Sequence, residues 1–139
     1  MPSIEEIQAQ IIEDFSFLPQ WEEKYAYLIE LGQKMAPLPD EHRVDKNLVR
    51  GCQSTVWLYR ECQDGKVILK ADSDSLIVKG LAALLLQVFN NQPGEAVYST
   101  KLSFLDETGL NRHLSSQRAN GLLAMIDQIK TFAENCSKG

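Results

Sequence analysis

The chain has 139 residues, of which 44% are hydrophobic and 24% are charged, a composition typical of a folded domain rather than a disordered segment. Its 14 basic and 19 acidic residues give a formal net charge of −5. A negative balance disfavours binding to the phosphate backbone of nucleic acids and to anionic membrane surfaces. We therefore expect residues 1–139 to form a single domain that binds neither nucleic acid nor membrane.

The cysteines and the hydropathy profile bear on the compartment. The three cysteines, Cys52, Cys62 and Cys136, are odd in number and contain no C-x-x-C pair, which argues against a disulfide framework and against a structural zinc site. No basic region precedes an apolar run at the amino terminus, and the longest apolar run, residues 81–86, is too short to span a bilayer. These features predict a cytoplasmic protein with reduced cysteines.

Two helices are expected in the first part of the chain. Ser3 and Glu6 have the spacing of a capping box, and apolar residues follow at helical spacing until Pro19. A second amphipathic helix is expected over residues 21–35, where Pro37 stops it. The two apolar stripes are Ile4, Ile7, Ile11 and Phe15, then Trp21, Tyr25, Leu28, Leu31 and Met35.

The middle of the chain changes to a strand pattern. Residues 40–51 are polar and predict a long loop, and residues 54–60 are rich in β-branched and aromatic residues. Asp64-Gly65 is a hairpin turn signal, and residues 66–71 predict the returning strand. The segment 76–89 is apolar on nearly every side, which predicts a buried central helix.

Asp72, Ser73 and Asp74 stand directly before that helix. Their oxygen atoms could bind a metal ion, but no matching cluster of ligands is visible elsewhere in the sequence. Asp and Ser are also preferred N-cap residues. The sequence therefore predicts that one of these three residues caps the helix.

The last third of the chain is less regular. Residues 95–110 predict a short helix and a third strand, and a final helix is expected to begin at Ser115 or Ser116. Its core stripe is Ala119, Leu122, Ile126, Ile129 and Ala133. Together the elements predict an α+β fold, with a small antiparallel β-sheet packed against several α-helices.

Cys52 has the most informative neighbours for chemistry. Arg50 places positive charge near the sulfur, which favours the thiolate, and Gly51 lets a reacting atom approach closely. Leu48 and Val49 could shield the sulfur from oxidants. On composition alone, a small buried hydrophobic residue at the start of a strand is the favoured interpretation of Cys52.

The other candidates carry weaker signals. Cys62 and Cys136 are interpreted as incidental, and about ten residues of strand at ~3.3 Å each would hold Cys62 beyond disulfide reach of Cys52. His42 is expected in solvent, and His113 precedes the last helix. The sequence contains no G-x-S-x-G, P-loop, G-x-G-x-x-G or H-E-x-x-H motif, so it does not support an ordinary small-molecule enzyme.

Four blocks of sequence resemble the SufE family of sulfur acceptor proteins. The residues around Cys52 resemble the family's active-cysteine signature, and the other blocks agree in order and spacing. The blocks are Gly51–Trp57, Trp21–Tyr25 with Ile29–Gly32, Asp72–Asp74 with Ile77–Leu81, and Gly109–Leu110 with His113–Ser115, Arg118 and Gly121–Leu122. The CsdE proteins share this layout, although Gln53-Ser54 is more similar to SufE. The family commonly has a proline where this chain has Ser115–Arg118.

The resemblance implies a SufE/IscU-like fold and a role in sulfur transfer. In this family a pyridoxal-phosphate cysteine desulfurase of the SufS or CsdA type passes persulfide sulfur to the acceptor cysteine. The acceptor stimulates the desulfurase and delivers the sulfur to an Fe–S scaffold of the SufBCD type. The resemblance makes Cys52 the catalytic residue, with no metal and no cofactor on this chain. The supporting candidates are Arg50, Gly51, Gln53, Asp74, His113 and Arg118.

Two alternatives stay open at this point. An Fe–S scaffold would need three or four clustered thiolate or imidazole ligands. A non-covalent regulator would stimulate the desulfurase by docking alone. The sequence also leaves open whether the chain forms a homodimer.

Overall fold

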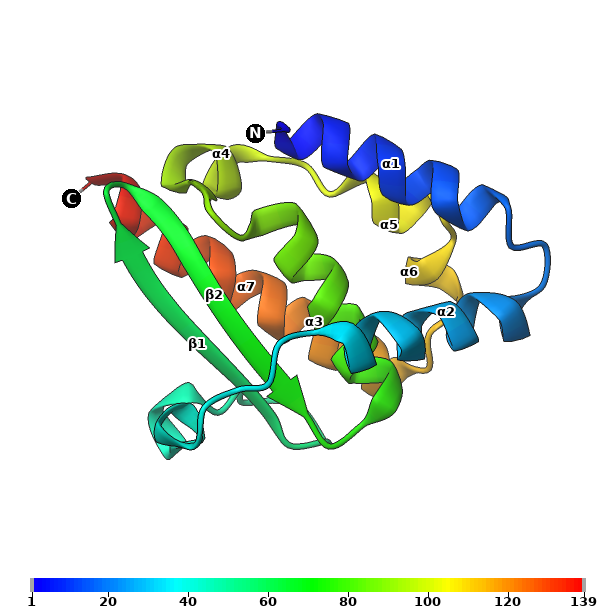
Figure 1. The fold of residues 1–139 in the computed structure, drawn as a ribbon, viewed down its shortest axis with the longest axis horizontal. Helices are drawn as coiled ribbons and strands as arrows, with labels where there is room; N and C mark the ends of the chain where they lie inside the picture. The colour runs from blue at the N-terminus through cyan, green and yellow to red at the C-terminus, as the bar shows by residue number, and fades with distance from the viewer. Residues whose placement is uncertain (1, 139) are drawn as a thin grey trace.

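The structure is a computed structural model and describes residues 2–138. Helices pack against one side of a small antiparallel sheet, so the fold is α+β as expected (Figure 1). The elements are α1 (Ile4–Ser16), α2 (Trp21–Lys34), β1 (Val56–Gln63), β2 (Lys66–Ser73), α3 (Leu76–Phe89), β3 (Gln92–Pro93), α4 (Gly94–Ser99), α5 (Ser103–Glu107), α6 (Leu110–His113) and α7 (Ser116–Lys138), with short 3-10 turns at Asp40–His42 and Asp45–Asn47.

Helix α1 begins with the capping box that the sequence predicts. The Glu6 amide donates to Ser3 Oγ at 3.1 Å, and the Ser3 amide donates to Glu6 Oε1 at 3.1 Å. These two bonds satisfy amide groups that the helix itself leaves without partners. Ile4, Ile11 and Phe15 are buried, so the predicted stripe faces the core.

The hairpin forms at the predicted turn. Asp64 and Gly65 both have positive φ, 52° and 77°, as a two-residue hairpin loop requires. β1 pairs antiparallel with β2, and β2 pairs antiparallel with the short β3. The third strand therefore precedes α4, and the prediction that it lies within residues 95–110 is wrong. That region forms α4 and α5 instead, where α4 packs against α7 and α5 packs against α1.

Helix α3 is the central element of the core. Most of its side chains are buried, and it packs against α2, β2, α7 and α1 (Figure 1). Gly80 allows the backbones of α2 and α3 to touch, because a Cβ there would lie 2.2 Å from the carbonyl oxygen of Leu28. The hairpin and helices α1, α2 and α7 therefore all pack against α3.

The N-cap of α3 is one residue later than expected. Ser75 caps the helix, and its Oγ accepts the Val78 amide at 3.3 Å. The prediction that Asp72, Ser73 or Asp74 is the cap is wrong, because β2 continues through Ser73 in register with Val56. The two aspartates are left for contacts with the loop that precedes β1.

Helix α7 runs along the hairpin and also packs against α3 and α4. Its buried side chains include Leu122, Met125, Ile129 and Ala133, whereas Ala119 and Ile126 are only half-buried. Within residues 2–138, no helix is long and apolar enough to cross a membrane.

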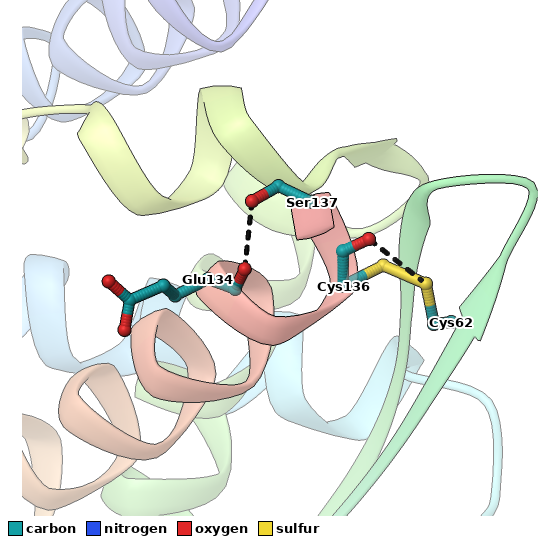
Figure 2. Close-up of a disulfide and its surroundings, with 4 residues drawn as sticks. All are labelled: Cys62, Glu134, Cys136 and Ser137. Atoms are coloured by element: carbon teal, nitrogen blue, oxygen red, sulfur yellow. Dashed lines mark hydrogen bonds between the residues drawn. A yellow bond between two sulfur atoms is a disulfide. The ribbon is translucent and has the colours of Figure 1, made fainter. Parts of the chain in front are cut away.

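A disulfide joins Cys62 to Cys136, with their Cα atoms 5.7 Å apart (Figure 2). The expectation that the cysteines are reduced and that these two are incidental is therefore wrong. The two residues are 74 positions apart in the chain. They meet because α7 runs the length of the hairpin and ends beside its turn (Figure 1).

Candidate functional site

Cys52 lies on a short loop that leaves the sheet and returns to it. Before the loop, Leu48 forms a bridge with Trp57, and the Val49 amide donates to the Val56 carbonyl at 2.9 Å. Residues 50–55 therefore form a closed excursion whose two ends are adjacent. Gly51 has a φ of 87°, and a Cβ at this position would meet no atom within 4 Å. Glycine is therefore favoured here by the positive φ of the backbone and not by close packing.

The second half of this loop is held by the end of β2. The Thr55 amide donates to Asp74 Oδ1 at 3.1 Å, and the Asp74 amide donates to the Thr55 carbonyl at 3.2 Å. The Ser73 hydroxyl also donates to the Thr55 carbonyl, at 2.9 Å. These bonds tie the loop to the hairpin at its end and leave Cys52 three residues away from the nearest anchor.

The Cys52 side chain rests in a small pocket between the loop, the start of α3 and the first turns of α7. The pocket has a volume of about 160 Å³ and is lined by Cys52, Gln53, Ser54, Ser75, Val78, Gln117, Arg118 and Gly121. A Cβ built on Gly121 would lie 3.4 Å from Cys52 Sγ, so the absent side chain leaves the sulfur close to α7. Cys52 itself is half-buried.

Burial raises the pKa of the Cys52 thiol, because the charged thiolate loses solvation inside the pocket. Arg50 lies exposed, and its expected effect on the thiolate stays a prediction. Burial therefore favours the protonated thiol over the thiolate in the resting conformation. A protonated thiol reacts slowly with small electrophiles.

The structure brings some of the predicted supporting residues to Cys52 and leaves others apart. Gln53 and Arg118 line the pocket, and Asp74 holds the loop. His113 does not line the pocket; its ring stacks on Trp21 with centroids 4.0 Å apart. Val49, expected to shield the sulfur, is instead buried in the main core.

Sequence reasoning missed part of the pocket. Ser75, Val78, Gln117 and Gly121 line it but were not selected as site residues. One signal was present at Gly121, because a glycine inside a helix costs about 1 kcal/mol against alanine and usually has a packing reason. The pocket wall could not otherwise be assigned, because its sides come from segments more than 20 residues apart in the chain.

A second group of charges fixes the segment that leads into the loop. Arg43 forms an ion pair with Asp72 and lies over the Trp57 ring, 5.0 Å from its centroid. Lys79 Nζ lies 3.2 Å from the same carboxylate. Burial raises the pKa of Asp72, but the hydrogen bonds from Arg43, Ser73 and Lys79 outweigh it and the net shift is downward.

The described residues do not gather ligands for a metal ion or a cluster. Among residues 2–138 there is no group of three or more His, Cys, Asp or Glu side chains with suitable geometry. Two of the cysteines are joined to each other near the end of α7 (Figure 2). Cys52 is the remaining cysteine, and its thiol is free.

Comparison with known proteins gives a consistent relationship. Residues 9–133 match the family described as "SufE: Fe-S metabolism associated domain". An uncharacterised SufE-like protein of Rhizobium meliloti is 42% identical over 132 residues, which cover 90% of this chain and 93% of that protein. The solution structure of a hypothetical protein from Thermus thermophilus has a TM-score of 0.78 and 25% identity, covering 96% of this chain and 97% of the other.

Proposed function

This chain belongs to the SufE family, whose domain is associated with Fe–S metabolism, and from that premise we propose that it is a sulfur acceptor that carries a persulfide on Cys52. The observation that carries the proposal is the state of Cys52. It is a free, half-buried thiol on a loop anchored at its ends, with an open pocket beside the sulfur. The donor is a pyridoxal-phosphate cysteine desulfurase of the SufS or CsdA type, and the recipient is a SufBCD-type Fe–S scaffold.

The transfer is a displacement at sulfur. The thiolate of Cys52 attacks the terminal sulfur of a persulfide on the desulfurase, and a new S–S bond forms on Cys52. The S–S bond on the desulfurase breaks, and its cysteine leaves as a thiolate. Cys52 loses one proton when it forms the thiolate, and the thiolate released on the desulfurase takes up one proton, so the number of bound protons does not change. No electron acceptor is needed, and the step requires no metal or cofactor on this chain.

The pocket suits the product of this step. Its volume of about 160 Å³ is several times the ~30 Å³ that a water molecule occupies in the liquid, so one additional sulfur atom fits beside Cys52. Gly121 and Val78 form an apolar part of the wall, and Arg118 places a cation at the edge. A persulfide held here is shielded from other thiols while its negative charge has a partner.

Transfer to and from other proteins needs the loop to move outward. Its tethers lie at Val49 and at Thr55, so residues 50–54 can swing without breaking the bonds that close the loop. We infer that docking of the desulfurase draws Cys52 out of the pocket. Because burial raises the pKa of the thiol, exposure on docking lowers that pKa and favours the thiolate at the moment of contact. A thiol that is protected at rest and active on docking gives selectivity for the partner.

The test is mass spectrometry after incubation with a cysteine desulfurase and L-cysteine. We expect the protein to gain the mass of one sulfur atom, located on the peptide that contains Cys52. A matched Cys52→Ser variant should gain none and should not stimulate the desulfurase. Cys62→Ser and Cys136→Ser are the control variants, and both should still take up sulfur on Cys52.

Two other outcomes would contradict the proposal. Stimulation of the desulfurase by Cys52→Ser, without added sulfur on the wild-type chain, would indicate a regulator that acts by docking alone. A stable brown chromophore after anaerobic reconstitution with iron and sulfide would indicate an Fe–S scaffold.

A further inference from the structure

A second pair of sulfur atoms lies at the opposite end of the molecule from Cys52. Gly121 touches the Cys52 pocket, whereas Cys136 is 15 residues further along α7, or about 22 Å at 1.5 Å per residue. Cys62 lies near the hairpin turn, at the other end of β1 from the Cys52 loop. The chemistry of this pair is therefore separate from that of Cys52.

The two halves of the disulfide differ in exposure. Cys62 lies next to the last residue of β1 and is exposed, whereas Cys136 is only 5% exposed. Figure 2 shows the bond crossing from the strand to the last turns of α7. Solvent therefore reaches Cys62 more readily than Cys136.

The surroundings of Cys136 keep it in place after the bond opens. The start of α4 packs on the end of α7 so closely that a Cβ on Gly94 would lie 2.7 Å from the Ala133 carbonyl oxygen and 3.3 Å from Cys136 Cβ. The Ser137 hydroxyl donates to the Glu134 carbonyl at 2.8 Å (Figure 2). β1 is held by its ladder to β2 up to the pair formed by Gln63 and Lys66.

We propose that Cys62 and Cys136 form a reversible thiol–disulfide exchange site, at which low-molecular-weight thiols and disulfides react at Cys62 and Cys136 is the resolving cysteine. In the oxidising direction the Cys62 thiolate attacks a small disulfide, RSSR, forming a mixed disulfide and releasing one RS⁻. Cys136 then attacks the Cys62 sulfur, forms the intramolecular bond and releases the second RS⁻. Two protein thiols are oxidised as one RSSR is reduced to two RSH, and the reverse sequence restores the thiols.

The experiment uses Cys52→Ser as the background, so that the pair holds the only cysteines and the outcome is independent of sulfur transfer. The reduced protein is mixed with hydroxyethyl disulfide, an uncharged probe, then quenched in acid and analysed by mass spectrometry. We expect a transient adduct of one hydroxyethylthio group on Cys62, followed by its loss as the Cys62–Cys136 bond forms. Added dithiothreitol should reopen that bond in the folded protein.

Matched variants separate the two roles. With Cys136→Ser, the adduct on Cys62 should form at an unchanged rate and persist. With Cys62→Ser, we expect adduct formation on Cys136 to be at least about tenfold slower, because the thiol is buried. Circular dichroism of each variant establishes that the fold is kept.

Three results would overturn the proposal. One is equal reactivity of the two cysteines in the single variants. Another is a Cys52→Ser protein whose adduct on Cys62 is never resolved. The third is a native disulfide that dithiothreitol opens only under conditions that unfold the protein. Because the kinetics of Cys52→Ser are measured with both members of the pair present, a folding defect in either single variant leaves this part of the test intact.

Discussion

The two ends of helix α7 hold sulfur in opposite ways. At its beginning, Cys52 lies on a loop that is tied at its ends. Cys52 and the first turns of α7 line the same pocket. At its end, Cys136 is part of the helix, is buried, and is bonded to the hairpin. In the proposed function the sulfur of Cys52 must reach a partner and needs a mobile carrier, whereas the disulfide joins two elements and needs both of them fixed. The same helix supplies a wall for the first and an anchor for the second.

This contrast predicts that the two sites differ most in their effect on stability. Replacing Cys62 and Cys136 together by serine should lower the free energy of unfolding of the oxidised protein by about 4 kcal/mol, because the bond closes a loop of 74 residues. For a chain of this size the melting temperature should fall by roughly 10–15 °C. The measurement is reversible thermal or denaturant unfolding without reductant.

Cys52→Ser is the matched control for that experiment. It should change the free energy of unfolding by less than about 1 kcal/mol, because the side chain is only half-buried and cross-links nothing. A loss of stability as large as that of the double variant would mean that the Cys52 loop is part of the structural framework, and the contrast would fail.

The next effect concerns the charge at the pocket. Arg118→Ala should lower the yield of the Cys52 persulfide about tenfold, the result of losing a charge-assisted hydrogen bond of roughly 1.4 kcal/mol to the persulfide anion. The pKa of the resting thiol should stay unchanged, because burial alone raises it. Sulfur uptake is measured by mass spectrometry and the pKa by the pH dependence of alkylation.

Arg118→Lys should restore part of the yield, since it keeps the charge but not the planar donor group. If the pKa of the resting thiol rises in Arg118→Ala, the guanidinium already lowers that pKa before any sulfur is bound and opposes the effect of burial.

A smaller effect is expected at the tether of the loop. Asp74→Ala removes the acceptor for the Thr55 amide, a hydrogen bond worth about 1 kcal/mol. If the loop opens to expose Cys52, its alkylation by iodoacetamide should become roughly fivefold faster. Glu22→Ala, which removes an exposed carboxylate on α2, is the control. An alkylation rate equal to that of the control would mean that Asp74 does not restrain the loop.

The smallest effect is in the pH profile of Cys52. Because burial raises the pKa of the folded thiol, the midpoint of its alkylation rate should lie at higher pH than that of a peptide of residues 50–55. Addition of a docking desulfurase that is itself free of reactive thiols should move the midpoint back down. A midpoint at or below that of the peptide would contradict the sheltered resting state.

Local signals in the sequence were sufficient for much of the fold. The capping box of Ser3 and Glu6, the Asp64-Gly65 turn and the apolar run of α3 all formed where predicted. Each depends on contacts between residues within about one turn or one hairpin, so the physical cause is contained in a short stretch of chain. The same locality identified Cys52 as the residue at the junction of loop and strand.

The sequence by itself determined the first two helices, the β1–β2 hairpin, α3 and α7, the family to which the chain belongs, and which cysteine has chemically informative neighbours. Only the tertiary structure decided that Cys62 meets Cys136, that Ser75 rather than Asp74 caps α3, and that Gly121 stands beside Cys52. The Cys62–Cys136 bond and the contact of Gly121 with Cys52 depend on how α7 lies along the hairpin, and the position of the cap depends on how far the pairing of β1 with β2 extends. Residue spacing carries no direct record of such contacts, because the free energy that selects them comes from burying surfaces that meet only in the folded protein.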